Sequence, residues 1–232
     1  MKRLVIFTGA GISAESGLAT FRDKNGLWTN EEWERLAHKD SLVNETQKCL
    51  NFYNWRRKQL AEVEPNHAHK VLAELEKDFN VSIITQNVDN LHERAGSTHV
   101  THLHGELSKV CSMDERTMCV KEYPLTIPIR VGDKAEDGSQ LRPYIVMFGE
   151  YVDKMNIAVD IVSQADIFVI IGTSLQVNPA AYLKDYAPND IPRFIIDPAE
   201  FNGGLAYDFE HIKTTAVAGI DILKEKLEML CI

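Results

Sequence analysis

Short apolar runs alternate along the chain with segments whose apolar residues recur at helical spacing. The runs with the length of buried strands are Arg3–Phe7, Val81–Thr85, Ile167–Ile171 and Phe194–Ile196. Residues 67–79 have helical spacing, and the tail from Ile220 to Leu230 has an amphipathic pattern. Apolar strands that alternate with helices are typical of a parallel sheet covered on both faces, so we predict an α/β fold.

Two stretches interrupt this alternation. Residues 24–60 are polar and aromatic with a mostly helical pattern, and residues 108–142 are irregular and contain prolines and glycines. We expect these two insertions to pack together as a smaller domain. The predicted large domain then comprises residues 1–23, 61–107 and 143–232.

Polar clusters follow the predicted strands, at Thr8–Gly11, Gln86–Asp89, Gly172–Ser174 and Asp197. Because ligands of parallel sheets bind at the carboxyl ends of the strands, four clusters on one rim indicate a single large ligand such as a dinucleotide. Gly9 and Gly11 permit a sharp turn into a helix expected to start within Ser13–Ser16, whose free N–H groups would face a phosphate. Their spacing differs from G-x-G-x-x-G, so this turn alone is a weak signal.

Composition and charge narrow the class of protein. The 232 residues carry a formal charge of −9 and contain no Lys/Arg block of the kind that general nucleic-acid binding needs. No signal peptide precedes the first apolar run, and no apolar stretch approaches the roughly 20 residues of a membrane span. We therefore expect a cytoplasmic protein with reduced thiols and without nucleic-acid or membrane partners. The sequence indicates no particular oligomeric state.

Five motifs together resemble the sirtuins, a family of NAD-dependent protein deacylases. They are GAGISAESGLATFRD from Gly9, TQNVDNLH from Thr85, HLHG from His102, FGE from Phe148 and GTSLQVNPAA from Gly172. They occur in the family's order, cover nearly the whole chain, and resemble the compact bacterial forms. The resemblance implies a Rossmann-like large domain, a small domain made by two insertions, and NAD in the cleft between them.

The resemblance also implies which residues bind NAD. These are Gly9, Ala10, Gly11, Ser13, Thr20, Phe21, Arg22, Gln86, Asn87, Asp89, Gly172, Thr173, Ser174, Val177, Asp197 and Ala216. Asp197 occupies a position where the family often has Asn. A carboxylate there can accept hydrogen bonds from both ribose hydroxyls but repels a 2′-phosphate, which favours NAD over NADP.

His104 matches the family's catalytic histidine, and the resemblance places Asn87 and Asp89 beside it in the catalytic set. The acyl-lysine oxygen displaces nicotinamide, and a ribose hydroxyl must then lose a proton. An imidazole with a pKa near 6.5 is mostly neutral at cellular pH and can take that proton. The products would be free lysine, nicotinamide and an O-acyl-ADP-ribose. A lone histidine is more often a hydrogen-bonded core residue; we assign that structural role to His102 and a surface position to His99.

Sirtuins usually hold a structural zinc with two C-x-x-C pairs. Cys111 stands near the start of the first pair, but its partner position is Asp114, and Cys119 lies too far along the chain. The second pair should precede Leu141, where GDKAEDGSQ contains no cysteine. Since structural zinc normally needs four ligands, we predict that the zinc is absent and that apolar residues from Val110 to Ile129 hold the module by packing. The alternative is a mixed site using Cys111, Cys119 and Asp or His.

Tyr53 and Arg56 lie three residues apart on a probable helix and therefore share a face. In sirtuins that remove acidic acyl groups, such a pair binds the distal carboxylate, for which a guanidinium is well suited. This predicts desuccinylase or demalonylase activity beside deacetylase activity. The alternative is an exposed helix on which Arg56, Arg57 and Lys58 are solvated.

Acylated-lysine proteins or peptides are the expected partners. The segment containing Val146, Phe148 and Gly149 would pair with an extended substrate by strand addition. Other functions considered are an ADP-ribosyltransferase or NAD glycohydrolase on the same fold, an NAD-sensing module without activity, and a dehydrogenase. The presence of Asn87, Asp89 and His104 argues against the sensing module, and the glycine spacing argues against a dehydrogenase.

Overall fold

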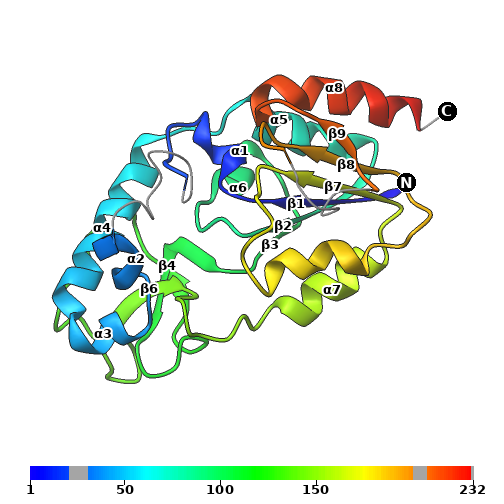
Figure 1. Cartoon of the computed structure of the whole chain (residues 1–232). Coiled ribbons are helices and arrows are strands. Elements are labelled where there is room, and N and C mark those ends of the chain that lie inside the picture. Colours follow the sequence, from blue (N-terminus) through cyan, green and yellow to red (C-terminus); the bar gives the residue numbers. More distant parts are fainter. Residues whose placement is uncertain (21–30, 201–207, 231–232) are drawn as a thin grey trace.

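The computed structural model of the chain describes residues 1–20, 31–200 and 208–230 (Figure 1). The predicted NAD-binding residues Phe21 and Arg22, and the first residues of the expected 24–60 insertion, lie outside the described residues.

A six-stranded parallel sheet forms the centre of the fold. Its strands are β1 (Arg3–Thr8), β2 (Asn80–Thr85), β3 (Val100–His102), β7 (Ile167–Ile171), β8 (Arg193–Ile196) and β9 (Glu210–Ile212), in the order β3-β2-β1-β7-β8-β9. The four predicted strands are confirmed. The outermost strands, β3 and β9, have three residues each and were not predicted.

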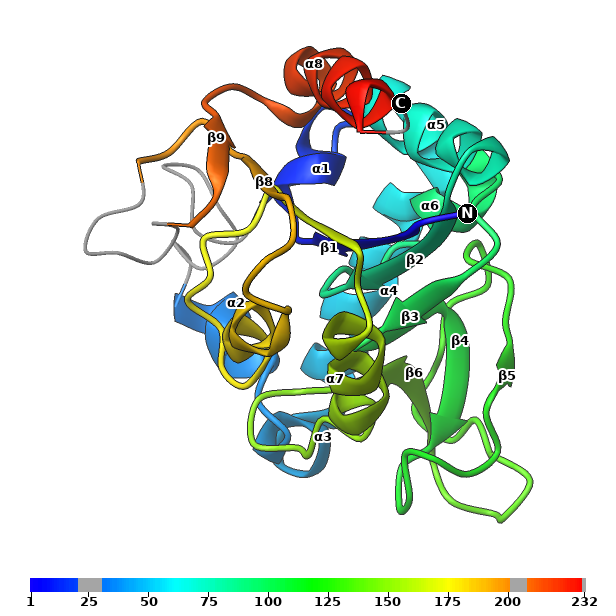
Figure 2. The same ribbon diagram turned by 90° about the vertical axis from the view of Figure 1, so that its right-hand side faces the viewer.

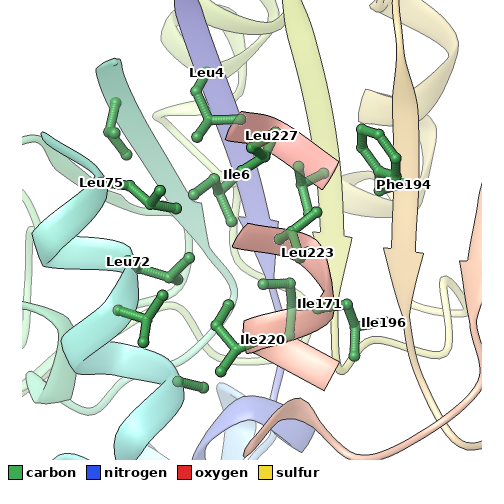
Figure 3. Close-up of a cluster of buried hydrophobic side chains, with 14 of the residues drawn as sticks. Leu4, Ile6, Leu72, Leu75, Ile171, Phe194, Ile196, Ile220, Leu223 and Leu227 are labelled. Atoms are coloured by element: carbon green, nitrogen blue, oxygen red, sulfur yellow. The ribbon is translucent and has the colours of Figure 1, made fainter. Parts of the chain in front are cut away.

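Helices cover both faces of this sheet, as predicted (Figures 1 and 2). On one face lie α5 (His67–Glu74) and α8 (Ala216–Met229), and on the other lie α7 (Met155–Ser163) and the 3₁₀ segment η3 (Ala180–Tyr186). Side chains of β1 alternate between the two cores. Leu4 and Ile6 join the core beneath α5 and α8 (Figure 3), whereas Val5 and Phe7 join the other. The strands are therefore apolar throughout, as expected for a sheet buried on both faces.

A second, three-stranded antiparallel sheet lies beside the first. Its order is β5-β4-β6, formed by β5 (Lys121–Glu122), β4 (Gly105–Ser112) and β6 (Leu141–Ile145). The neighbouring helices are α2 (Glu31–Leu36), α3 (Asp40–Asn44) and α4 (Thr46–Glu62) (Figure 1). The sheet extends beyond the expected insertion 108–142 at both ends. The exact division into two domains stays a prediction.

The predicted packing of the 108–142 segment is only partly confirmed. Val110 and Ile129 are buried with Leu50 of α4 and Leu141 of β6. Met118, Val120 and Ile127 instead are 52%, 40% and 46% exposed, so they add little to this core. Apolar packing therefore comes from fewer residues than predicted.

The expected helix start within Ser13–Ser16 is wrong by two residues. Helix α1 spans Gly11–Ala14. The short helix α6 (Leu91–Ala95) comes after β2. The shift arises because the Gly11 N–H donates to the carbonyl of Gly172 at the end of β7, which fixes the first turn there. Among the helices of the described residues, none combines the length and the apolar character needed to cross a membrane.

Candidate active site

A cavity of about 490 Å³ opens along the carboxyl ends of β1, β2, β7 and β8. Seventeen of the residues predicted to bind cofactor or substrate or to act in catalysis line it: Ala10, Gly11, Thr20, Tyr53, Arg56, Gln86, Asn87, His104, Val146, Phe148, Gly149, Gly172, Thr173, Ser174, Val177, Asp197 and Ala216. The four strand-end clusters of the sequence thus converge on one cavity, as predicted.

Glycines at the floor of the cavity bring two strand ends into close contact. A Cβ atom on Gly11 would lie 2.6 Å from the Cα of Gly172, and Gly172 itself has a φ of +62°. Gly9 donates its N–H to Ile171 O, and Gly11 donates to Gly172 O. The prediction that free N–H groups at this turn face a phosphate is therefore wrong for Gly11, because its N–H is engaged by protein. Gly9 also packs closely against the backbone of Gly172 and does not line the cavity.

His104 projects into the cavity from the segment that joins β3 to β4. Its Nδ1–H donates to the carbonyl of Gln86 at 3.0 Å, which leaves Nε2 as the nitrogen that can accept a proton. Burial lowers the pKa of His104, although the hydrogen bond to Gln86 opposes this shift. The neighbouring Gly105 has a φ of +79°, and a Cβ there would lie 2.0 Å from Tyr144 O. Only glycine lets β6 approach so closely beside this histidine.

Ser13 and Asp89 lie behind the lining and support Asn87. The Asn87 side-chain amide donates to Gly9 O at 3.1 Å and to Ser13 Oγ at 3.2 Å. Ser13 Oγ–H donates to Asp89 Oδ2, and the other carboxylate oxygen accepts the Leu91 N–H. Burial raises the pKa of Asp89, and these two hydrogen bonds oppose that effect. Both residues were predicted to contact NAD; here they orient a residue of the lining.

Tyr53 and Arg56 lie on α4 at the same cavity and are 6% and 8% exposed. Burial lowers the pKa of Arg56 and raises the pKa of Tyr53. Arg57 is completely buried and donates to the carbonyls of Leu107 and Pro124. The alternative of a solvated basic helix is therefore wrong for both arginines. No sequence pattern indicated this role for Arg57.

The segment predicted to pair with substrate already bonds to the chain between α2 and α3, through an isolated bridge of Phe148 with His38. Phe148 N–H donates to Ala37 O, and Phe148 O accepts the Lys39 N–H, both at 3.0 Å. Val146 N–H donates to His104 O at 2.9 Å. Gly149 follows these bonds in a turn, with a φ of +87°, and lines the cavity. Glu150 of the same motif pairs with Arg142 through two bonds of 2.6 and 3.0 Å and is structural.

The lining fits a dinucleotide. Gln86 lines the cavity, and its Nε2 is buried without a hydrogen-bond partner among the described residues. A ligand acceptor would satisfy it. At the far end, Asp197 accepts the Ala199 N–H and Thr215 caps α8. The lining residues not predicted from the sequence include Ala14, Glu15, Pro179, Pro198, Ala199 and Thr215, of which the first three stand within motifs already recognised.

Among the described residues, one group of side chains has the spacing of a metal site: Glu93, His102 and Glu106. Its hydrogen bonds favour ion pairs instead. His102 is buried and makes bonds of 3.0 Å to Asn87 O and 2.7 Å to Glu93, and Glu106 is 2.8 Å from Lys109 Nζ. His102 is thus structural, as predicted.

The residues near Cys111 do not fit a structural zinc site. Burial raises the pKa of the Cys111 thiol to about 12, and the thiol donates to Pro143 O. A zinc ligand must instead be a thiolate. Neither Cys111 nor Cys119 belongs to the described group with metal-ligand spacing. The absence of zinc stays a prediction.

A hydroxyl cluster joins the segments where the zinc ligands of sirtuins would stand. Ser112 Oγ accepts the N–H groups of Asp114 and Glu115, both at 3.2 Å. It lies 2.8 Å from Ser139 Oγ, which donates to Asp137. Ser112 therefore donates to Ser139, and one chain of hydrogen bonds links β4 to the loop before β6.

Fold and cavity together define an α/β protein with a dinucleotide-type site at the carboxyl ends of its parallel strands. A family model described as "Sir2 family" matches residues 9–179. The chain therefore belongs to the Sir2 family, the sirtuins, as its motifs predicted.

Named relatives agree with this assignment. An NAD-dependent protein deacylase of Bacteroides thetaiotaomicron is 51% identical, with 98% of each chain covered. The crystal structure of a Sir2 homologue–NAD complex superimposes with a TM-score of 0.85 at 36% identity, covering 100% of this chain and 91% of the other. A Sir2–p53 peptide–NAD⁺ complex gives a TM-score of 0.74 at 27% identity, covering 97% and 93%.

Proposed function

We infer that this protein removes acyl groups from lysine side chains of proteins in an NAD-dependent reaction. The observation that carries this function is the imidazole of His104, oriented by Gln86 O and facing the cavity through Nε2. Its relatives support the reaction: they include the named deacylase of B. thetaiotaomicron and a homologue solved with NAD and a peptide.

Bound NAD supplies an activated glycosidic bond, whose cleavage releases nicotinamide and leaves the ribose to accept the acyl oxygen. The protein's own groups orient the reactants and remove a proton from a ribose hydroxyl. His104 Nε2 accepts the proton of a ribose hydroxyl, because burial keeps the imidazole neutral at pH 7. Asn87, held by Ser13, presents its side chain beside this base. Ala10, Thr173 and Asp197 bind the remainder of the dinucleotide.

The acyl group enters between His104 and α4. Arg56 makes that end of the cavity cationic, Tyr53 adds a neutral hydroxyl, and apolar side chains of Phe52, Leu107 and Ile145 line the same cavity. A succinyl or malonyl carboxylate can accept hydrogen bonds from a guanidinium in this poorly hydrated setting, and such charge-assisted bonds are strong. We propose that acidic acyl groups are preferred substrates beside acetyl groups.

A paired assay tests this preference. Acetyl-lysine and succinyl-lysine versions of one peptide are compared in wild type and in Arg56→Met, with and without NAD, and products are identified by mass. Arg56→Met should lower kcat/KM for the succinyl peptide by about 10- to 100-fold and leave the acetyl peptide within about 3-fold. Lys58→Met, an exposed change on the same helix, is the matched control.

The products of the same assay separate the candidate activities. Deacylation gives an O-acyl-ADP-ribose, whereas an ADP-ribosyltransferase gives modified protein and a glycohydrolase gives free ADP-ribose. Equal losses for both peptides in Arg56→Met would remove the carboxylate argument while leaving deacylation in place.

Three further points belong to this proposal. Protein substrates present an acyl-lysine on an extended segment beside Val146–Gly149. Residues 24–60 and 108–142 act as the small domain that closes the cavity. The proposed location is the cytoplasm, because the thiols of Cys49 and Cys111 are free and cytoplasmic proteins keep their thiols reduced.

A further inference from the structure

Two histidines hold the same turn in the same way. His102 Nδ1 donates to Asn87 O, and His104 Nδ1 donates to Gln86 O, each at 3.0 Å. The turn between β2 and α6 is thus fixed at two successive carbonyls by two histidines that lie two residues apart. Asn87 of this turn and His104 belong to the proposed catalytic set.

The two imidazoles differ at Nε2. That nitrogen of His102 lies 2.7 Å from Glu93 Oε1, which at neutral pH can only accept a hydrogen bond. The Asn87 carbonyl oxygen also only accepts. Both ring nitrogens of His102 must therefore carry protons, which makes it an imidazolium, while His104 is neutral.

Charge distribution supports this difference. Burial alone would lower the pKa of His102, but the hydrogen bond and charge of Glu93 outweigh it and the pKa is raised. The titratable groups that act on or feel His102 are Glu93 and His92 on α6, Glu106 on β4, and Asp89 in the turn, and Lys109 pairs with Glu106. Glu93, His102, Glu106 and Lys109 alternate in sign. His102 in turn helps Asp89 to stay ionised, since its charge opposes the effect of burial.

We propose that Glu93 is a positioning residue for deacylation: it keeps His102 doubly protonated, and the charged His102 locks the turn that carries Asn87 and Asp89. Glu93 touches neither cofactor nor substrate. One route runs through the hydrogen bond from His102 to the Asn87 carbonyl. The other runs through the charge of His102, which keeps Asp89 ionised; Asp89 accepts from Ser13, and Ser13 accepts from the Asn87 side chain. This inference rests on the proposed function, because the turn is useful only if the reaction occurs.

The protonation state is tested without any assay of activity. Long-range ¹H–¹⁵N NMR of the imidazole rings distinguishes an imidazolium from either neutral tautomer. Wild-type His102 should be doubly protonated at pH 7.5 and His104 should be the neutral Nδ1–H tautomer. In Glu93→Gln, which keeps the shape and a hydrogen-bond partner, His102 should titrate near pH 6.5 or below. A neutral His102 in the wild type overturns the proposal.

Kinetics test the positioning role. Glu93→Gln should lower kcat by about 10-fold or more, with KM for NAD within about 2-fold, because a misplaced catalytic group slows chemistry more than binding. The alkaline fall of the rate should move to lower pH. Glu64→Gln, which removes the exposed ion pair with Arg94, is the matched control and should behave as wild type.

A double-variant cycle separates positioning from general destabilisation. His102→Gln should cost as much as Glu93→Gln, and the double variant should cost no more, since both remove one contact. Additive losses, or unchanged kcat in Glu93→Gln, would overturn the proposal. So would a stoichiometric metal ion that Glu93→Gln releases. A charged His102 in an enzyme without deacylase activity would instead refute the proposed function and leave this ion pair intact.

Discussion

Ser112 and Ser139 lie with their hydroxyl oxygens 2.8 Å apart and tie β4 to the loop that precedes β6. Ser112 is completely buried and also accepts two backbone N–H groups. A four-ligand zinc site would make the same connection through metal bonds. Here the connection depends on a hydroxyl.

Ser112→Ala should therefore destabilise the protein. Two N–H groups lose their acceptor and the Ser139 oxygen loses one donor, which should lower the free energy of unfolding by about 2 kcal/mol and Tm by about 4 to 8 °C. Thermal unfolding with and without a chelator measures this. The control is Ser163→Ala, an exposed serine whose hydroxyl bonds only to Asp160 O. About one zinc per chain that survives dialysis, together with a Tm that the chelator lowers, would contradict both this role and the predicted absence of zinc.

Arg57→Met should loosen the segment around residues 123–127. The buried guanidinium donates to the carbonyls of Leu107, Tyr123 and Pro124, and methionine offers no donor to any of them. We expect a loss of about 3 kcal/mol in unfolding free energy and faster proteolysis within 113–138. Urea unfolding and limited proteolysis measure the two effects, with Lys58→Met as control. Unchanged proteolysis would show that the segment does not depend on Arg57.

The rate of deacylation should fall on the acid side through a pKa below 6.5. Catalysis needs neutral His104, and burial lowers the pKa of this group. His104→Ala should reduce kcat by at least about 100-fold, whereas replacing the exposed His99 by alanine should have little effect. A pH–rate profile of kcat/KM provides the measurement. Retained turnover in His104→Ala would remove this base from the mechanism.

Stability should fall in mild acid because of His69. Burial lowers its pKa to about 4, whereas the unfolded chain binds that proton near 6.5. Between these values the unfolded state holds more protons, so unfolding is favoured as the pH drops, by about 3 kcal/mol in all. Urea unfolding at several pH values should show this slope in the wild type and a shallower one in His69→Gln. Parallel curves would assign the acid sensitivity to other groups.

Long patterns in the sequence predicted most of the fold. Ile167–Ile171 was predicted with its observed limits, because a strand buried on both faces must be apolar at every position. Edge strand β9, Glu210–Ile212, has two polar residues among its three and is too short to show a period. The position of α1 depends on a bond from Gly11 to Gly172, across 161 residues of chain, which no local pattern reveals.

Motifs predicted the lining of the site better than its support. His104 and the strand-end clusters carry recognisable residue types, so the sequence identifies them. The contact of Glu93 with His102 joins a helix to a strand, and the contact of Ser112 with Ser139 crosses a loop of ordinary composition. Such pairs are defined by tertiary distance alone. The two adjacent arginines also cannot be told apart by sequence pattern: Arg56 lines the cavity, whereas Arg57 bonds to the carbonyl of Pro124 in the 108–142 segment.

The seam between Gly11 and Gly172 leaves no room for one additional methyl group, since a Cβ on either residue would lie within 2.7 Å of the other's backbone. The backbones that follow β1 and β7 are therefore packed directly against each other at the base of the cavity, where the Gly11 N–H also donates to Gly172 O. Gly172→Ala would force the ends of β1 and β7 apart at the place where the dinucleotide binds. The absence of a side chain at both positions is therefore a condition for the shape of the cavity floor.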